Sequence, residues 1–117
     1  MGSLFKKNKV IGQVYLSGID GLIWEVGFVF NDVYQKQGYA TEAVNTVLKD
    51  VFHNQNAHRV FAECNPKNES SWRLLERIGF KKEGCLRQNI YFNKNKYDEP
   101  IWQDTYIYGL LSSDYIF

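Results

Sequence analysis

Hydrophobic and polar residues alternate along two stretches near the start of the chain, and this period-two pattern predicts β-strands. Residues 10–16 and 22–30 are rich in β-branched and aromatic residues. Between them, residues 17–21 carry two glycines, which is typical of a turn. The three stretches together predict an antiparallel hairpin that ends at Asn31 and Asp32.

The period changes after Gly38. Apolar residues recur at spacings of 3, 4, 7, 8, 11 and 12 from Ala40, as far as Phe52. These spacings form one stripe of an α-helix about four turns long. Polar residues such as Glu42 and Lys49 fall on the other side of the predicted helix.

The second half of the chain predicts a strand at residues 59–64 and a helix at residues 69–78. Asn65 and Pro66 close the strand. Asn68 is a good N-cap for the helix, and Gly79 is well placed to end it.

A second hairpin is predicted at the end of the chain. Its strands are residues 80–91 and 101–111, and its polar turn is residues 93–96. The order β-β-α-β-α-β-β predicts one mixed α/β (α+β) domain, residues 10–117, in which helices flank a mostly antiparallel sheet. Residues 1–9 are expected to be a solvated tail. The predicted core consists of Val14, Leu16, Val26, Phe28, Val44, Val47, Leu48, Phe52, Val60, Phe61, Leu74, Leu75, Ile78 and Phe80.

Composition narrows the class of protein. The 117 residues carry a net charge of +1 without a basic stripe, which argues against a nucleic-acid partner. No apolar run approaches the roughly 20 residues that span a bilayer. Cys64 and Cys85 lack the spacing of metal ligands, so no metal is expected. We expect a soluble cytoplasmic protein with two reduced thiols, although the spacing leaves a disulfide open.

The stretch most informative about chemistry is residues 35–42, which join a strand to a helix. Gly38 allows close approach of the backbone, and Ala40 keeps that approach free of bulk. The unpaired amides and the dipole of a helix start attract phosphate groups. The same glycine also fits an ordinary turn, so this pattern alone leaves both interpretations open.

Several motifs, in the same order as in a known family, favour the phosphate-binding interpretation over an ordinary turn. The spacing Gln35-x-x-Gly38-x-Ala40 resembles the Q/R-x-x-G-x-G/A signature of the GNAT N-acetyltransferases. The stretches 65–71, 74–80 and Glu83-Gly84 resemble the N-x-x-S, G-F and E-G motifs of the branch that contains the ribosomal-protein N-terminal acetyltransferases. The similarity runs from about residue 11 to residue 111.

The resemblance implies acetyl-coenzyme A as the cofactor and assigns residues to it. Backbone amides from Gln37 to Thr41 would hold the pyrophosphate, and Phe28 to Phe30 would pair with the pantetheine arm. Asn68 would contact the same arm, and Ser71 would lie near the thiol. A helix-capping role for Asn68 and a first-turn position for Ser71 explain the two residues equally well. The implied cofactor-binding residues are Phe28, Val29, Phe30, Gln35, Lys36, Gln37, Gly38, Tyr39, Ala40, Thr41, Asn68 and Ser71.

For catalysis, Glu25 is the candidate base and Ser71 the second candidate catalytic residue. Several family members carry a glutamate at the place of Glu25, and desolvation beside Trp24 would raise its pKa. An exposed strand glutamate without a role is the alternative. Family members often have a tyrosine acid where this chain has Leu75, and residues 88–91 lack the carboxylate of some relatives. Tyr91, Tyr106 and Tyr108 remain as donors, with packing in the core or the sheet as the preferred interpretation.

The family usually has a strand, one or two helices and another strand before the position of Val10. Their absence here is expected to leave the cofactor half present and much of the acceptor half missing. An exposed edge on the first strand would favour a homodimer. The predicted function is transfer of an acetyl group to a primary amine, either a protein N-terminus or a small amine. A non-catalytic acyl-coenzyme-A-binding module and an inactive truncated domain are the alternatives.

Overall fold

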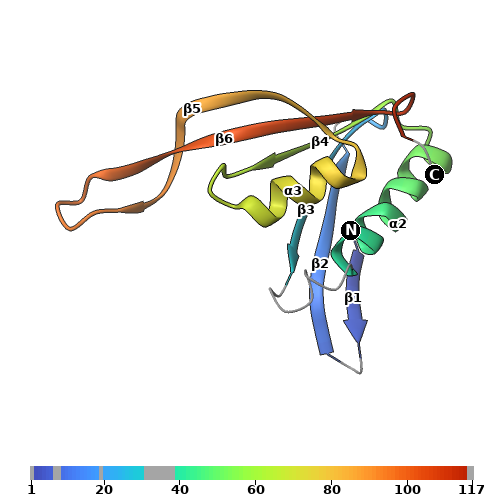
Figure 1. Cartoon of the computed structure of the whole chain (residues 1–117), viewed down its shortest axis with the longest axis horizontal. Helices are drawn as coiled ribbons and strands as arrows, with labels where there is room; N and C mark the ends of the chain where they lie inside the picture. The colour runs from blue at the N-terminus through green and yellow to red at the C-terminus, as the bar shows by residue number, and fades with distance from the viewer. Residues whose placement is uncertain (1, 7–8, 19, 31–38, 116–117) are drawn as a thin grey trace.

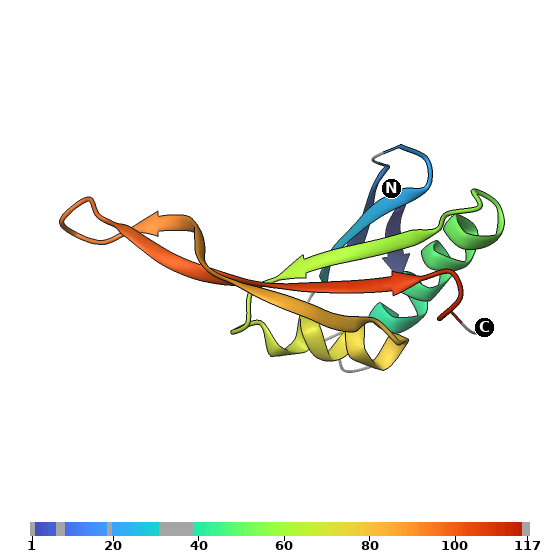
Figure 2. The same cartoon turned by 90° about the horizontal axis from the view of Figure 1, so that it is seen from above.

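The described part of the protein forms a six-stranded mixed sheet with two helices on one of its faces (Figures 1 and 2). The computed structural model describes residues 2–6, 9–18, 20–30 and 39–115. The elements are β1 (Gly2–Lys6), β2 (Lys9–Gly18), β3 (Ile23–Phe30), α2 (Tyr39–His53), β4 (Arg59–Cys64), α3 (Glu69–Ile78), β5 (Lys81–Lys94) and β6 (Pro100–Leu111). In the sheet the strands lie in the order β1-β2-β3-β4-β6-β5. All neighbours are antiparallel except β3 and β4, which are parallel.

From β2 onward the order of elements is the predicted one, and the mixed α/β class is confirmed. β4 and α3 have the predicted bounds. The turn of the last hairpin was predicted too early, because β5 continues to Lys94. In that turn the side chain of Asn95 accepts hydrogen bonds from the backbone N–H groups of Tyr97 (2.8 Å) and Glu99 (3.1 Å).

The start of the chain differs from the prediction. Gly2–Lys6, expected within a solvated tail, forms β1 and pairs antiparallel with β2. A segment this short carries too little pattern to predict a strand by itself, and its conformation depends on the partner edge. β1 therefore covers the edge of β2 whose expected exposure had favoured a dimer.

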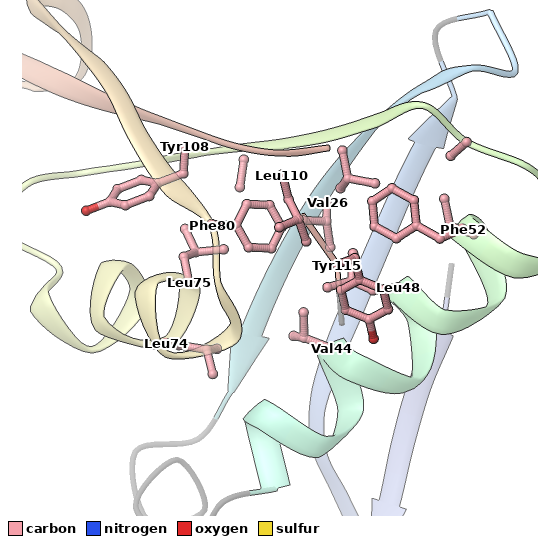
Figure 3. Packing of buried hydrophobic residues seen from close by; sticks show 14 of the residues in the cluster. Val26, Val44, Leu48, Phe52, Leu74, Leu75, Phe80, Tyr108, Leu110 and Tyr115 are labelled. Carbon is pink, nitrogen blue, oxygen red and sulfur yellow. The ribbon is translucent and has the colours of Figure 1, made fainter. Parts of the chain in front are cut away.

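The core lies between the sheet and its two helices, as Figure 3 shows. Apolar residues of α2 and α3 point toward residues of β3, β4 and β6, and most predicted core positions are confirmed. The buried ones are Val26, Val44, Leu48, Phe52, Val60, Leu74, Leu75 and Phe80, and those packed at its border are Leu16, Phe28, Val47 and Ile78. The side chain of Val14 lies outside the described part.

Phe61 is the exception among the predicted core residues. It alternates with the buried Val60 and Ala62, so its side chain lies on the face of the sheet away from the helices. There it packs under the guanidinium of Arg59, which is 5.8 Å from the ring centroid. Its hydrophobicity suggested burial, but the strand alternation decides which face it occupies.

The core also contains Tyr108, for which a core or sheet position was the preferred interpretation, and Tyr115, which the sequence analysis did not place there. Tyr108 is fully buried, and its hydroxyl donates to Oε2 of Glu76 on α3 (2.7 Å). Tyr115 stacks on Phe52 with ring centroids 5.1 Å apart, and its hydroxyl donates to the carbonyl of Asn45 (3.1 Å). These contacts hold α3 to β6 and α2 to the residues that follow β6.

An ion pair crosses the opposite face of the sheet. Arg59 of β4 and Glu83 of β5 make two hydrogen bonds, at 2.8 Å and 2.6 Å, across the intervening strand β6. They pass over Gly109, where a Cβ atom would collide with both side chains. Gly109 thus leaves room for the pair, and Glu83 of the Glu-Gly motif has a structural role.

We predict that this pair makes stability depend on pH. The hydrogen bond from Arg59 lowers the pKa of Glu83 below its usual value. A lowered folded-state pKa gives stability that is present above the unfolded-chain pKa of about 4.3 and lost as the pH falls toward the folded-state pKa. In urea unfolding, Glu83→Gln should therefore cost up to about 1 kcal/mol near neutral pH, and this cost should shrink in acid.

Glycine substitutions provide the matched control for this pair. Gly109→Ala should displace the two side chains and weaken the same pH dependence. Gly84→Ala, with nothing within 4 Å of its added Cβ, should leave it intact. An undiminished cost of Glu83→Gln at low pH would contradict the assignment.

Candidate functional site

The parallel strands β3 and β4 separate part-way along their length. Their register pairs Ile23 with Arg59, Trp24 with Val60 and Glu25 with Phe61. Beyond this point β3 continues to Phe30 and β4 to Cys64, with no further pair between them in the described structure. Because unpaired strand edges present backbone N–H and C=O groups, they can bind an extended ligand as an added strand.

A cavity of about 390 Å³ lies at the open end of this gap. It collects residues of β3, the end of β4, the start of α3 and both strands of the last hairpin. Its lining consists of Phe28, Glu63, Cys64, Asn65, Asn68, Ser71, Ile90, Phe92, Asp104 and Thr105. Three predicted site residues, Phe28, Asn68 and Ser71, therefore meet in one cavity, whereas Glu25 does not line it.

The first turn of α3 forms one wall of the cavity and is held in several ways. Oδ1 of Asn68 accepts from the backbone N–H of Ser71 (3.4 Å) and from the hydroxyl of Ser70 (3.1 Å), so the predicted N-cap is confirmed. The indole of Trp72 donates to the carbonyl of Pro66 (2.9 Å). The side chain of Asn65 donates to that of Gln103 on β6. The segment that joins β4 to α3 is thus fixed to α3 through Trp72 and to β6 through Asn65.

Glu25 occupies the last paired position before the strands separate. Burial raises the pKa of its carboxyl, and the charge and hydrogen bonding of Glu63 raise the pKa further. Trp24, which was predicted to bury this carboxyl, lies on the other face of β3 and packs against the core. The two glutamates share the face of the sheet away from the helices.

Sequence analysis missed Glu63 and Asp104. The alternation of residues 59–64 places Glu63 on one face with Phe61, but only the parallel pairing of β3 and β4 brings it to Glu25. Asp104 of β6 lies at the cavity and accepts from the backbone N–H of Gln88 (2.8 Å). A carboxylate is therefore present beside residues 88–91, although it comes from the neighbouring strand.

The candidate proton donors lie in different environments. Tyr108 is buried in the core with a raised pKa, caused by desolvation and then by its bond to Glu76. Tyr106 packs at the border of the core. Tyr91 is exposed and lies edge-on to Trp102, with centroids 5.4 Å apart. Packing in the core or the sheet, the preferred interpretation of these tyrosines, agrees with these positions. Leu75 is buried in the core.

The two cysteines are free, as expected. Both are registered opposite Tyr106, Cys64 from β4 and Cys85 from β5. Two strand spacings, about 10 Å, separate them, which exceeds the roughly 7 Å limit for a disulfide. Cys64 lines the cavity, and burial raises the pKa of its thiol to about 11, so it stays protonated at neutral pH.

The predicted phosphate-binding loop is only partly covered by the structure. Residues Gln35, Lys36, Gln37 and Gly38 lie outside the described part. α2 begins at Tyr39, and Ala40 is buried. The hydroxyl of Thr41 accepts from the guanidinium of Arg77 (3.1 Å), which brings a cation to the first turn of α2. A helix start at the predicted place is thus confirmed, and its phosphate-binding role stays a prediction.

Comparison with known proteins gives the decisive observation. Residues 2–81 match the family described as the acetyltransferase (GNAT) domain. The chain belongs to the GNAT acetyltransferase family. Its curated relatives include the uncharacterized N-acetyltransferase YnaD of Bacillus subtilis, which is 38% identical over 92 residues, covering 79% of this chain and 51% of the relative.

Two further relatives extend the comparison. The ribosomal-protein-serine acetyltransferase of Escherichia coli is 28% identical over 101 residues, 85% of this chain and 56% of that protein. The crystal structure of a GNAT acetyltransferase from Bacillus anthracis superposes with a TM-score of 0.79 at 33% identity, covering 94% of this chain and 63% of that chain. This GNAT chain therefore spans about half the length of the curated relatives it matches.

The described residues contain neither a membrane-spanning helix nor a cluster of metal ligands. None of the helices described here is long and apolar enough to cross a membrane. No group of three or more His, Cys, Asp or Glu side chains comes together there as a metal site.

We predict that Asn68 substitutions can separate capping from ligand binding. Asn68→Ala should lower the unfolding free energy by about 1 kcal/mol, because α3 loses its cap. Asn68→Ser should recover most of that stability, since a serine hydroxyl also caps. If Asn68 also contacts the cofactor, the serine variant should bind it as weakly as the alanine variant. Equal stability of all three proteins in urea unfolding would contradict the capping role.

Proposed function

We propose that this GNAT domain transfers an acetyl group from acetyl-coenzyme A to a primary amine. The observation that carries the proposal is the separation of β3 from β4, with a cavity at the open end. The parted edges suit an extended, amide-containing arm such as pantetheine. The start of α2 suits a pyrophosphate, because its backbone N–H groups and dipole attract anions.

The predicted cofactor residues are assigned to parts of acetyl-coenzyme A in the same way. We place the pyrophosphate at the amides from Gln37 to Thr41 and the pantetheine arm along Phe28, Val29 and Phe30. Asn68 and Ser71 stand at the cavity, where the thioester would lie. Acetyl-coenzyme A supplies the activated acyl group, and the residues of the chain have to position the amine and accept its proton.

Glu25 is the proposed base, acting directly or through water. A carboxylate with a raised pKa is a better proton acceptor than an ordinary one. Glu63 links Glu25 to the cavity, since it raises the pKa of Glu25 and also lines the cavity. We propose that the pair holds a cationic amine until it loses its proton.

The acceptor is proposed to be a protein N-terminus or a small amine. The name of the ribosomal-protein-serine acetyltransferase indicates a protein acceptor for that relative. In this chain, Glu63 and Asp104 give the cavity wall negative charge that favours an ammonium group of either kind. A cytoplasmic location and a homodimer belong to the same proposal.

A non-catalytic acyl-coenzyme-A-binding module is the second candidate. Leu75 favours it, because many GNAT enzymes carry a tyrosine acid at the position of this buried leucine. The two candidates differ in turnover and agree in binding.

We predict that the chain binds acetyl-coenzyme A in titration calorimetry and that Gly38→Pro abolishes binding. Proline removes an N–H and fixes φ where the loop would wrap a phosphate. Circular dichroism should show that the variant remains folded. Binding that survives the substitution would sink the proposed phosphate loop. Binding without turnover over a panel of amines would favour the second candidate.

We also predict that Glu25→Gln lowers kcat/KM by about 10²–10⁴-fold, the usual contribution of a general base. The pKa of Glu25 is raised above the ordinary value of about 4.3. The activity of the parent protein should therefore fall as the pH drops toward this raised pKa. Glu63→Gln should move this limb to lower pH. Glu99→Gln at the hairpin tip is the matched control and should change neither. An unchanged rate in Glu25→Gln would refute its role as base.

A further inference from the structure

A second cavity, of about 260 Å³, adjoins the cavity at the open end of the strand gap, which we call the first cavity. The two share Asn65 and Asp104, so they meet beside the end of β4. The volume of the second cavity is below the roughly 300–1,000 Å³ of pockets that hold a whole small-molecule ligand. It therefore suits one part of a ligand whose remainder lies in the first cavity.

An irregularity of β5 shapes the wall of the second cavity. The register with β6 shifts within residues 86–90, and Gln88 has φ 46°, a left-handed conformation that is uncommon outside glycine. Its backbone N–H donates to Oδ1 of Asp104 (2.8 Å), and the hydroxyl of Thr105 donates to Oδ1 of Asn89 (2.8 Å). Two consecutive residues of β6 thus hold this bulge. Bulges beside active sites commonly redirect a side chain, and Gln88 lines the second cavity.

The hydrogen-bonding groups of the second cavity divide into those used within the protein and those left for a ligand. Asn65 is used on both sides, because its Nδ2 donates to Gln103 and its Oδ1 accepts from the backbone N–H of Lys67 (2.8 Å). Within the described part of the chain, Nε2 of Gln103, Nζ of Lys67 and Oδ2 of Asp104 have no protein partner. Two donors and one carboxylate oxygen are therefore left for a ligand.

The two cavities differ in charge. Glu63 and Asp104 line the first cavity, and none of its described lining residues is a lysine or an arginine. In the second cavity, Lys67 accompanies Asp104 and offsets its charge. An ammonium group is therefore attracted to the first cavity, whereas the second offers no net attraction to another cation. The free donors of Gln103 and Lys67 suit a carbonyl oxygen instead.

We propose that the second cavity binds the first peptide group of an acceptor peptide whose N-terminal amine lies in the first cavity. In such a peptide the amine and the carbonyl carbon are bonded to the same Cα atom, which fits two cavities that meet at Asp104. The ammonium group contacts Asp104, and the carbonyl oxygen accepts from Gln103 and Lys67. The inference rests on the proposed acetyl transfer and selects the N-terminal α-amine among its acceptors.

Other amines lack the group that the second cavity would bind. The amine of a lysine side chain stands at the end of a flexible four-carbon stem, away from any carbonyl group. A polyamine offers only further ammonium groups, for which the second cavity has no net attraction. Both should therefore occupy the first cavity alone and gain nothing from the second.

A pair of amines tests this selectivity. Alanine N-methylamide carries an α-amine and one peptide group, and sec-butylamine carries the amine on a similar skeleton without the peptide group. Gln103→Glu keeps an oxygen that accepts from Asn65 and replaces the free donor by an acceptor. It should lower the ratio of kcat/KM for alanine N-methylamide to that for sec-butylamine about tenfold, the order of one lost hydrogen bond. Comparing this ratio between proteins cancels the difference in pKa between the two amines.

Two further variants accompany this measurement. Lys67→Met keeps a long side chain without the charge, and it should lower the same ratio. Gln55→Glu makes the same chemical change as Gln103→Glu on an exposed residue that follows α2 and lines neither cavity, so it should leave the ratio unchanged. Circular dichroism should show that all three variants are folded. An unchanged ratio in Gln103→Glu overturns the proposal.

Nuclear magnetic resonance of the parent protein provides a readout that needs no turnover. Alanine N-methylamide, added up to about 10 mM and thus above usual KM values, should shift the side-chain amide signal of Gln103 and the indole N–H signal of Trp102. Both residues line the second cavity. sec-Butylamine should leave these signals in place. Shifts without turnover of either amine would contradict the proposed acetyl transfer and support the peptide site. Absent shifts, or equal shifts with sec-butylamine, overturn the peptide site itself.

Discussion

The parallel pairing of β3 with β4, and its end after Glu25 and Phe61, is the constraint on which the site depends. Where the strands are paired, they join the β1–β3 part of the sheet to the β4–β6 part. Where they separate, they leave two backbone edges and a cavity between them. The same feature brings Glu25 and Glu63 together, because the two residues stand on neighbouring strands at the point of separation.

This separation persists because other contacts hold the two sides. On one side, α2 packs its apolar stripe on β3 and on the C-terminal residues around Tyr115. On the other side, α3 is tied to β6 through Tyr108 and Glu76 and to the end of β4 through Trp72 and Pro66. Both helices share one face of the sheet, so their packing sets where the cavity walls stand without filling the gap.

The sequence predicted most local structure correctly because short-range physics determines it. The stripe from Ala40 to Phe52 requires a helix in any fold, and Asn68 and Gly79 mark the ends of α3 by side-chain and backbone chemistry of their own. Predictions failed where contacts between residues distant in the sequence determine the structure. Phe61 is apolar, yet alternation with its buried neighbours turned it away from the core, and β1 forms only because β2 offers an edge.

By itself, then, the sequence determined the order of the elements from β2 onward, the family motifs and the candidate residues Glu25, Asn68 and Ser71. Only the tertiary structure decided that Asn68 and Ser71 share a cavity with Glu63 and Asp104, and that Glu25 lies just outside it. The physical reason is that hydrophobic periodicity and helix capping depend on residues only a few positions apart in the sequence. The meeting of β3, β4, α3 and β6 instead depends on strand order and on where one pair of strands stops hydrogen bonding.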